Sequence, residues 1–457
     1  QGQIVTRMAP EPSKYNHIGH ALSFLINYLY AEKYCGKCIL RFDDTNPEKE
    51  TQEYVDAMQE DVIEYLGIKP TEVVFASDDM ERFYTHAEQL IHKGHAYICT
   101  CTGESLSKMR REMNDCPHRN QPKEQNIEGW SAMQQGKDAV LRLRIDMQHK
   151  NAVMRDPVIY RVIRCTHYRQ GDKYQVWPLY DFESVVEEGI HGVTHVLRSN
   201  EFDSRIELQQ YIAKLLGFSA PVYRHYGRFT ISGATTQGRE IREGIEAGMF
   251  MGWDDPRLVT LRALRRRGIV PEAYFRLARI CGMSKRETNL DFSMIASINR
   301  QILDESAKRL FLVRNPMRIP IGNMGSRHVS AALHPERDIG ERDIAVPGEI
   351  YLEQEDLTGI QEGEVVRLMD FANIRRTAEG FVWHSQEYEA FKKEGKRNLH
   401  WVSGDAVDVS VMMPDTSVIE AKAERYVQEL QVGEVVQFQR FGFCRLDAPG
   451  SFWFSHE

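Results

Sequence analysis

The sequence predicts an α/β protein that begins with a parallel sheet, interrupts it with an inserted domain, and continues into a helical domain and an all-β barrel region. Three observations support this: strand and helix patterns alternate over residues 3–94, Cys and His cluster in an irregular segment after Ala96, and short β-rich runs dominate after Pro320. The length of 457 residues suits about three domains.

The first 94 residues alternate between the two kinds of apolar periodicity. We expect strand Gln3–Met8, helix Ile18–Tyr34, strand Cys38–Phe42, helix Thr51–Leu66, strand Val73–Phe75 and helix Met80–Lys93. This order is typical of a parallel sheet with helices on its faces, because parallel strands need a crossover connection.

The rest of the chain changes pattern twice. Residues 96–175 are irregular, with alternating strands such as Val140–Ile145, and we interpret them as an insertion between two halves of the sheet. Helical periodicity dominates from Ile206 to Val313, with a turn at Gly252–Pro256. The later β-rich runs, which predict barrels, are Gly348–Leu352, Val365–Met369, Val407–Met412 and Val435–Phe443.

Composition excludes several classes of protein. Hydrophobic residues make up 42% and charged residues 27%, as in ordinary folded chains. The longest nearly apolar stretch, Ala21–Tyr30, is too short for the ~20 residues that a membrane helix needs, so we expect no membrane association. Eight cysteines in this length are no disulfide scaffold, and we expect a reducing, cytoplasmic location.

Charge is unevenly distributed. The net charge is −8, but the segment from Arg242 to Arg318 carries 15 Lys and Arg against 9 Asp and Glu. Arg265, Arg266 and Arg267 are consecutive within it. Such a basic segment on an acidic protein suits contact with a phosphate backbone, although a solvated helix face with paired charges would look similar.

Two histidines mark a candidate nucleotide site. His17 and His20 follow a strand and a proline-containing turn at the expected start of a helix, whose free N–H groups and partial positive charge suit phosphate. Two imidazoles three residues apart share a helix face, and Gly19 between them allows a flat base to approach the backbone. Two surface histidines near a helix cap are the alternative, but the strand, turn and glycine together favour the site.

The segment from Arg7 to His20 resembles the signature of class I aminoacyl-tRNA synthetases. Further segments resemble the glutamyl and glutaminyl branch of that family: Arg41–Pro47, Arg155–Pro157, Pro178–Phe182, Gly192–Arg198, Gly252–Arg257, Arg266–Gly268 and Val435–Phe443. The β-rich tail is similar to the archaeal and eukaryotic type.

The resemblance, which covers nearly the whole chain, implies five parts. They are the first half of a Rossmann-type catalytic domain (1–95), an inserted acceptor-stem domain (96–176), the second catalytic half (177–240), a helical stem-contact domain (241–320) and a two-barrel anticodon-binding domain (321–457).

The activity implied by the resemblance is ATP-dependent ligation of L-glutamate to tRNA(Glu) through a glutamyl adenylate, by a monomer that uses ATP with Mg²⁺. Carboxylate attack on the α-phosphate needs positioning and electrostatics rather than a protein nucleophile. The implied catalytic residues are His17 and His20. The implied ATP-binding residues are Glu11, His17, Gly19, His20 and Glu201, and the implied substrate-binding residues are Arg7, Ala9, Asp43, Tyr180 and Arg198.

The choice between glutamate and glutamine rests on Arg198. By the resemblance, this position faces the amino-acid side chain and is arginine in glutamyl enzymes. A guanidinium binds a carboxylate through two charge-assisted hydrogen bonds, whereas an amide would leave it a buried, unpaired charge. Arg198 therefore favours glutamate and opposes a glutaminyl enzyme.

A second candidate site consists of Cys99-x-Cys101 and, after fourteen residues, Cys116-x-His118. Three thiolates and an imidazole are a tetrahedral zinc set, so we expect Zn²⁺ rather than four unligated side chains. The segment resembles the zinc-bearing acceptor-stem module of several glutamyl enzymes. Cys35 and Cys38 lack a second pair nearby, and we interpret them as packing residues.

One departure from the family raises an alternative function. The family's second signature contains a lysine and should precede Gly252, yet Ile231–Arg242 contains none. A catalytically silent tRNA-binding paralogue would explain the loss. We expect instead that the natural chain has further residues between Gly233 and Glu240, including a lysine; Arg239 is the cation available as the sequence stands.

Overall fold

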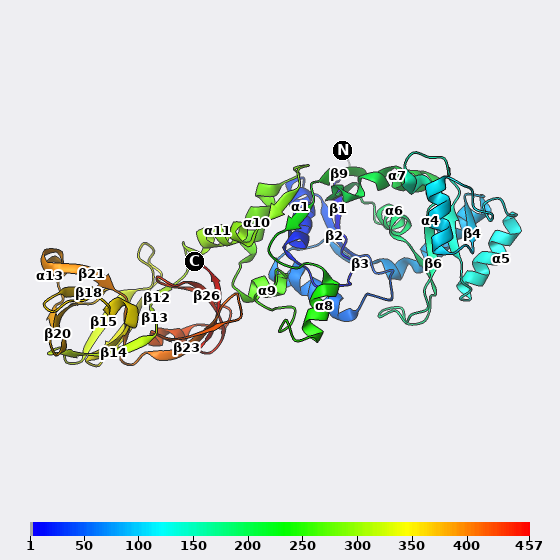
Figure 1. Ribbon diagram of the computed structural model, residues 1–457. Helices are drawn as coiled ribbons and strands as arrows, with labels where there is room; N and C mark the ends of the chain where they lie inside the picture. Colours follow the sequence, from blue (N-terminus) through cyan, green and yellow to red (C-terminus); the bar gives the residue numbers. More distant parts are fainter. Residues whose placement is uncertain (1–2) are drawn as a thin grey trace. The chain divides into compact units, whose positions relative to one another are not determined.

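The computed structural model describes residues 3–457, in which the chain divides into two compact units (Figure 1). The first unit comprises Gln1–Gly233, Gln237–Arg242 and Tyr274–Leu290, and the second comprises Ala234–Thr236, Glu243–Ala273 and Asp291–Glu457. Residues 241–320 are divided between the two units. The domain boundaries expected from the sequence stay predictions.

A parallel sheet lies at the centre of the first unit. Strand β1 (Val5–Met8) pairs with β2 (Lys37–Phe42), and β2 pairs with β3 (Glu72–Phe75). The connecting helices are α1 (Ile18–Lys33), α2 (Gln52–Gln59), continued by a π-helical turn to Tyr65, and α3 (Met80–His92). The alternation expected from the sequence is confirmed, with ends shifted by one or two residues except in α2.

A second parallel pair adjoins β1. It consists of β8 (His195–Ser199) and β9 (Val222–Tyr226), and Thr194, just before β8, bonds to the backbone of Val5 in both directions. The strands therefore lie in the order β3-β2-β1-β8-β9, and the order reverses between β1 and β8. In sheets of this kind ligands bind beyond the carboxyl ends of the strands at the reversal point.

Two helices lie next to β8 and β9 in the sequence. Before β8 stands α6 (Tyr180–Ile190), and between β8 and β9 stands α7 (Ile206–Leu216). Further elements of the unit are β10 (Phe229–Ile231), β11 (Thr288–Leu290), α8 (Gly238–Glu246) and α10 (Pro271–Cys281), the last two being shared with the second unit.

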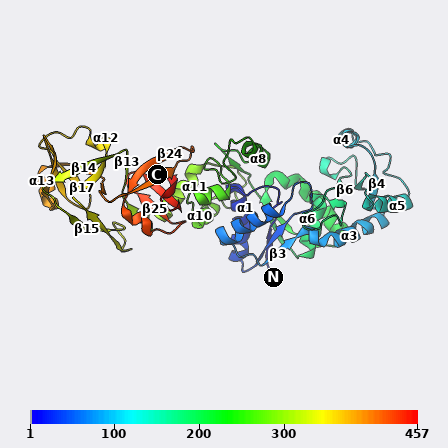
Figure 2. The same ribbon diagram turned by 90° about the horizontal axis from the view of Figure 1, so that it is seen from below.

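The insertion folds as a four-stranded antiparallel sheet in the order β4-β5-β6-β7. Its strands are Ala96–Cys99, Val140–Leu143, Val158–Val162 and Val176–Pro178, with helices α4 (Gly103–Glu112) and α5 (Lys123–Gln134) after β4. Helix α5 packs beside α3 (Figure 2). One hydrophobic core, around Trp130, Tyr160 and Trp177, joins this sheet to α3, α6 and α7, so the insertion does not have a separate core of its own there.

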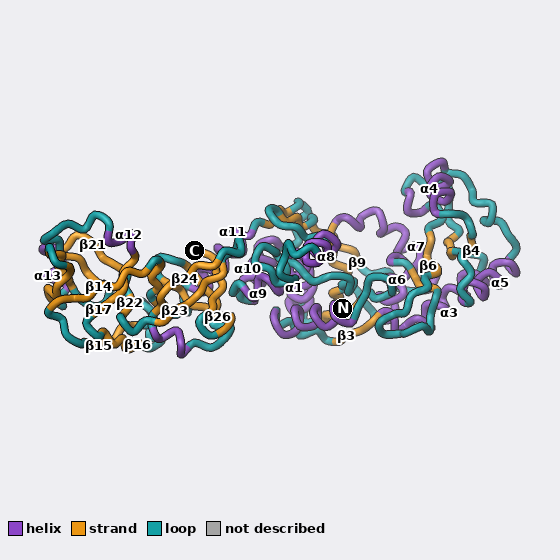
Figure 3. The backbone as a smooth tube through the Cα atoms, turned by 60° about the horizontal axis from the view of Figure 1, so that its bottom comes forward, coloured by secondary structure: helices purple, strands orange, loops and turns teal. Residues whose placement is uncertain are grey.

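The second unit is rich in strands, which Figure 3 colours orange. Its helices are α9 (Leu261–Arg266), α11 (Phe292–Leu303), α12 (Gln354–Leu357) and α13 (Tyr388–Glu394). Two seven-stranded sheets have the orders β12-β25-β26-β27-β23-β24-β13 and β21-β18-β19-β20-β14-β17-β22, beside the hairpin β15-β16. Each sheet has its own hydrophobic core.

The strands of the second unit begin before Pro320. They are β12 (Arg309–Leu310), β13 (Leu312–Arg314), β14 (Pro316–Gly322), β15 (Arg327–Ala332), β16 (Glu341–Val346), β17 (Glu349–Glu353), β18 (Val365–Leu368), β19 (Asn373–Thr377), β20 (Gly380–Ser385), β21 (Gly395–Leu399), β22 (Val402–Ser403), β23 (Val407–Met412), β24 (Val418–Ala423), β25 (Val435–Phe438), β26 (Gly442–Ala448) and β27 (Ser451–His456). The β-rich character expected from the sequence is confirmed.

Three expectations about elements are wrong. Residues 206–313 are not uniformly helical, because Val222–Tyr226 forms a parallel strand with β8. Val435–Phe443 is not one strand, because the chain turns at Arg440, whose φ is 64°, and returns as β26. Cys35 is not a packing residue: it is exposed in a left-handed turn, whereas Cys38 is buried. Among residues 3–457, no helix is both long and apolar enough to cross a membrane.

Candidate functional site

The residues expected to bind substrate gather at one edge of the parallel sheet. Ala9 and Glu11 follow β1, Asp43 follows β2, and Arg198 stands near the end of β8. Tyr180 opens α6, and its hydroxyl accepts a hydrogen bond from Arg198 Nη1 at 3.0 Å. Strands β1 and β8 lie next to each other here, and the strand order reverses between them, which is where an α/β sheet binds its ligands.

The two histidines cap helix α1. His17 is the N-cap residue, and its Nδ1 accepts a hydrogen bond from Gly19 N at 3.1 Å. His20 Nδ1 accepts one from His17 N at 3.1 Å, which completes a reciprocal capping box with imidazoles in place of the usual hydroxyl and carboxyl groups. The ring centroids lie 3.8 Å apart.

This arrangement fixes the protonation state of both rings. Burial, and next the charge of Lys14, lower the pKa of His17 to about 3; burial, His17 and Lys14 hold the pKa of His20 well below its usual value. Both imidazoles are therefore neutral near pH 7. Because each Nδ1 accepts a backbone N–H, each proton lies on Nε2, which leaves two N–H donors at a positive helix end.

Gly19 is required by this cap. A Cβ at Gly19 would lie 3.0 Å from His17 Cε1 and 3.1 Å from His17 Nδ1. Any other side chain would press on the imidazole and disturb its hydrogen bond to the Gly19 backbone.

Arg198 is held by neutral groups. It is 5% exposed, and besides Tyr180 it donates from Nε to His225 Nε2 at 3.1 Å and from Nη2 to Gln209 Oε1 at 2.8 Å. His225 in turn contacts Asp203 through Nδ1, which places the His225 proton on that nitrogen. The guanidinium has five N–H groups, so two remain for a ligand.

The other buried arginines of this edge have carboxylate partners. Arg7 Nε donates to Glu188 Oε1 at 3.2 Å, and Arg41 binds Asp43 through two hydrogen bonds of 2.5 and 3.1 Å. Asp43 is 7% exposed. Of the three buried arginines Arg7, Arg41 and Arg198, it is Arg198 whose hydrogen bonds all go to uncharged side-chain atoms.

The remaining expected site residues lie at the surface or at the rim. Glu201 is exposed, accepts a hydrogen bond from Ser199 and pairs with Arg228 at 3.4 Å; Glu11 is exposed and Ala9 is half-buried.

Sequence reasoning missed three residues of this region. Gln209 and His225 hold Arg198, but Gln209 sits within a regular helix and His225 within a strand that was not expected. Lys14 acts electrostatically on both His17 and His20. The sequence could have indicated Lys14, because it lies only three residues before His17.

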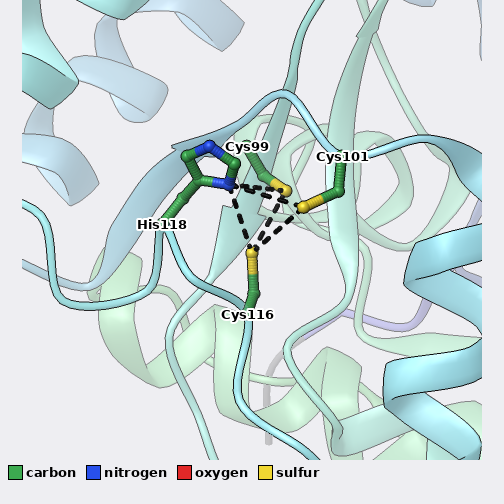
Figure 4. Close-up of side chains that lie close together, drawn as sticks. All are labelled: Cys99, Cys101, Cys116 and His118. Atoms are coloured by element: carbon green, nitrogen blue, oxygen red, sulfur yellow. Dashed lines mark hydrogen bonds between the residues drawn. The ribbon is translucent and has the colours of Figure 1, made fainter.

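The four expected metal ligands converge at the start of the insertion. Cys99 ends β4, Cys101 follows it, and Cys116 and His118 come from the loop after α4 (Figure 4). The Cys116 sulfur lies 3.3 Å from that of Cys99, and His118 Nδ1 lies 3.5–3.7 Å from the three sulfurs. All four ligand atoms lie within 4.8 Å of one another.

These distances fit a tetrahedral zinc ion. Bonds of about 2.3 Å to sulfur and about 2.0 Å to nitrogen place neighbouring ligand atoms roughly 3.5–3.8 Å apart in a tetrahedron. His118 Nε2 lies 3.1 Å from the Thr100 hydroxyl, a partner that holds the proton on Nε2 and leaves Nδ1 for the metal.

The arginine run contributes to structure within the second unit. Arg266 binds Asp447 through two hydrogen bonds and pairs with Asp254, and Arg267 donates to the backbone of Pro256 and Ser455. Arg266 and Arg267 therefore have partners within the protein, and the expectation that this basic segment contacts a phosphate backbone stays a prediction.

Comparison with known proteins gives a consistent result. Residues 3–305 match the family described as "tRNA synthetases class I (E and Q), catalytic domain", and residues 307–387 and 387–447 match two families described as its anti-codon binding domain.

Individual relatives agree. A glutamate–tRNA ligase of Pyrococcus furiosus is 39% identical over 98% of this chain and 81% of its own length, and one of Methanothermobacter thermautotrophicus is 37% identical over 100% and 83%. The fold is similar to the crystal structure of a glutamate tRNA ligase from Elizabethkingia meningosepticum, with a TM-score of 0.50, 17% identity and coverage of 67% of this chain and 70% of that one. The chain belongs to the class I tRNA synthetases for glutamate and glutamine.

Proposed function

We propose that this protein ligates L-glutamate to tRNA(Glu) at the expense of ATP, through a glutamyl-adenylate intermediate. The observation that carries the proposal is Arg198, a buried guanidinium held by Tyr180, Gln209 and His225 and, among residues 3–457, by no carboxylate. The archaeal relatives that share 37–39% identity over nearly the full chain are named glutamate–tRNA ligases.

The surroundings of Arg198 suit the side chain of glutamate. Burying a guanidinium costs free energy unless an anion pairs with it, and the γ-carboxylate of glutamate supplies that anion through the two remaining N–H groups. Glutamine offers a neutral amide, which leaves the charge uncompensated. Arg7, Tyr180 and Ala9 complete the pocket, and Asp43 receives the substrate ammonium with the lone pairs that Arg41 leaves free.

The histidines suit adenylate formation. An oxygen of the glutamate α-carboxylate forms a bond to the α-phosphorus while the bond to pyrophosphate breaks, and negative charge grows on the phosphate oxygens. Neutral His17 and His20 donate from Nε2 to these oxygens beside the positive end of α1. Gly19 packs on the adenine and Glu11 and Glu201 hold the nucleotide; Mg²⁺ arrives with the triphosphate and neutralises part of its charge.

The other parts of the chain suit tRNA. We assign the insertion to the acceptor stem, where Cys99, Cys101, Cys116 and His118 hold a structural Zn²⁺ that ties the loop after α4 to β4. The two seven-stranded sheets close as barrels and bind the anticodon, in a monomeric cytoplasmic enzyme. The two anti-codon binding families that match residues 307–447 support this assignment.

Steady-state aminoacylation tests the proposal. Purified protein is supplied with ATP, tRNA(Glu) and either glutamate or glutamine, and charged tRNA is measured. We expect glutamate to be used and glutamine to be rejected by at least a hundredfold in kcat/KM, because a site built for a polar partner strongly rejects the analogue that lacks it. Equal or better use of glutamine would overturn the assignment.

A catalytically silent tRNA-binding paralogue is the second candidate. It is favoured by Ile231–Arg242, which contains no lysine although the family signature has one. Tight binding of tRNA(Glu) without any glutamate-dependent use of ATP would establish that candidate.

A further inference from the structure

Lys14 lies beside the proposed ATP site. It stands between Glu11 and His17 in the turn that leads into α1, and its charge lowers the pKa of both His17 and His20. Lys14 therefore lies within electrostatic range of both imidazoles. Lys14 is half-buried, and burial lowers its own pKa.

The Lys14 ammonium has no close partner. Within the part of the chain that the structure describes, it makes no hydrogen bond and no ion pair within 4.0 Å; the carboxylate that acts on it electrostatically, Glu11, is exposed. A partly desolvated cation without a counter-ion costs free energy, and an anionic ligand removes that cost.

The lysine-free segment packs directly against Lys14. Helix α8 begins at Gly238, where a Cβ would lie 2.9 Å from Lys14 Cβ and 3.2 Å from Lys14 Cδ. One turn later, Arg242 Nη2 lies 3.5 Å from the carbonyl oxygen of Ser13. The aliphatic stem of Lys14 is therefore fixed between the turn before α1 and the N-terminus of α8.

We propose that Lys14 supplies the cation that binds the β- and γ-phosphates of ATP and the departing pyrophosphate. This role rests on the proposed function. Two helix N-termini, two imidazole N–H donors and one unpaired ammonium converge here, all of them suited to phosphate oxygens. Gly238 is what allows this convergence, since any larger residue would meet the stem of Lys14.

The chemistry requires no proton transfer from Lys14. As the bond between the α-phosphorus and the pyrophosphate oxygen breaks, its electron pair remains on pyrophosphate, and the ammonium stabilises the added charge. A cation held on the rigid turn before α1 thereby performs this task although residues 231–242 contain no lysine.

The test compares Lys14→Met with Lys14→Arg in tRNA-dependent ATP–pyrophosphate exchange. The methionine variant keeps an aliphatic side chain against Gly238 but has no positive charge. The arginine variant has a positive charge at the same position. We expect kcat to fall on the order of 100-fold in the methionine variant, as for loss of one transition-state donor, with the KM for glutamate within twofold of wild type. The arginine variant should recover at least a tenth of the wild-type kcat.

Controls separate the outcomes. Lys93→Met, an exposed lysine at the end of α3, should behave as wild type. A Lys14→Met protein with kcat within threefold of wild type would overturn the inference while leaving the proposed function intact, and so would an arginine variant as inactive as the methionine variant. Absence of exchange in the wild-type protein would instead contradict the proposed function itself.

Discussion

Arg198, the residue proposed to recognise glutamate, differs from the other buried arginines of the site in the groups that surround it. Within residues 3–457, its three hydrogen bonds go to a hydroxyl, an amide oxygen and an imidazole nitrogen, so its position is fixed without a direct bond to a carboxylate. Arg7 and Arg41 are positioned by carboxylates instead, which cancel their charge. The difference between these arginines is a property of their neighbours.

Replacing Arg198 with glutamine should remove the preference for glutamate. The variant keeps hydrogen-bonding capacity but loses the charge, and the lost charge-assisted bonds correspond to roughly a 10- to 100-fold fall in kcat/KM for glutamate. The KM for ATP should change little, because Arg198 is proposed to bind the amino acid, whereas His17 and His20 are proposed to bind ATP. Aminoacylation kinetics with each substrate varied in turn measure both quantities.

The matched control is Arg224→Gln on the same strand as His225, since Arg224 is exposed and donates to the adjacent backbone. If both variants lost glutamate use to the same extent, general damage to the sheet rather than charge recognition would be responsible.

His191 makes a pH-dependent contribution to stability. Its Nε2 lies 3.4 Å from Glu187 and 3.7 Å from Asp79, and these carboxylates raise the pKa of His191 to about 9. A pKa raised on folding gives stability that is complete below the unfolded value of about 6.5 and is lost as pH rises through about 9. His191→Asn should therefore cost about 2–3 kcal/mol of unfolding free energy at pH 6 and much less at pH 10.

Denaturant unfolding of both proteins at the two pH values measures this difference. A cost that is the same at pH 6 and pH 10 would mean that His191 contributes by packing and not by charge.

The sequence reveals some site residues and conceals others for a physical reason. His17, Gly19 and His20 are adjacent in the chain, so their joint geometry follows from one helix start. Gln209 and His225 reach Arg198 from separate elements, 11 and 27 residues away. Such contacts depend on tertiary packing, which no local pattern encodes.

At the scale of elements, the loop after α4 shows what a metal can stabilise. Cys99 is buried at the end of β4, while Cys116 and His118 lie in a loop, and the four ligand atoms converge without a disulfide. Structural zinc of this kind holds together short loops that have little core of their own. The site could be predicted from the sequence because its ligands form two close pairs, Cys-x-Cys and Cys-x-His.

Metal analysis of chelator-washed, reduced protein should give one equivalent of Zn²⁺ per chain. Cys101→Ser should reduce the content well below one equivalent, because the remaining three ligands bind more weakly. Cys165→Ser, an exposed cysteine outside the cluster, is the control and should keep its zinc. Wild-type protein with far less than one equivalent would argue against the site.

Strand and helix prediction succeeded where amphipathic patterns were long and failed where they were short. Helix α1 was expected within one residue of its observed end, since its apolar positions recur over 16 residues. Strand β9 reads Val-Tyr-Arg-His-Tyr, in which Arg224 and His225 weaken the apolar signal, and it becomes a strand by pairing with β8. The turn between β25 and β26 depends on the positive φ of Arg440. Arginine rarely adopts a positive φ, so the residue type does not predict this turn.

At the scale of the whole molecule, each unit has a chemical character of its own. The first unit holds the residues proposed to bind substrate, His17 and His20, and the cysteine cluster, and the second holds two strand-rich cores. Within the second unit, buried Arg342 of β16 binds Glu424 by two hydrogen bonds, and Glu424 also accepts the Phe311 backbone N–H. The succession of a parallel sheet and a later strand-rich region was predictable, because each has its own apolar periodicity in the sequence. The expectation of further residues between Gly233 and Glu240 stays a prediction.

Glutamate-dependent ATP–pyrophosphate exchange, measured with and without tRNA(Glu), tests the central claim most directly. Exchange reports reversible formation of the adenylate, which requires the glutamate pocket, the histidines and the phosphate site to act together. We expect exchange with glutamate in the presence of tRNA(Glu) and none with glutamine. We expect little exchange when tRNA is omitted, because the resemblance to the glutamyl and glutaminyl branch implies that activation itself requires tRNA. Complete absence of exchange with glutamate and tRNA(Glu) would contradict the assignment of this protein as a glutamate–tRNA ligase.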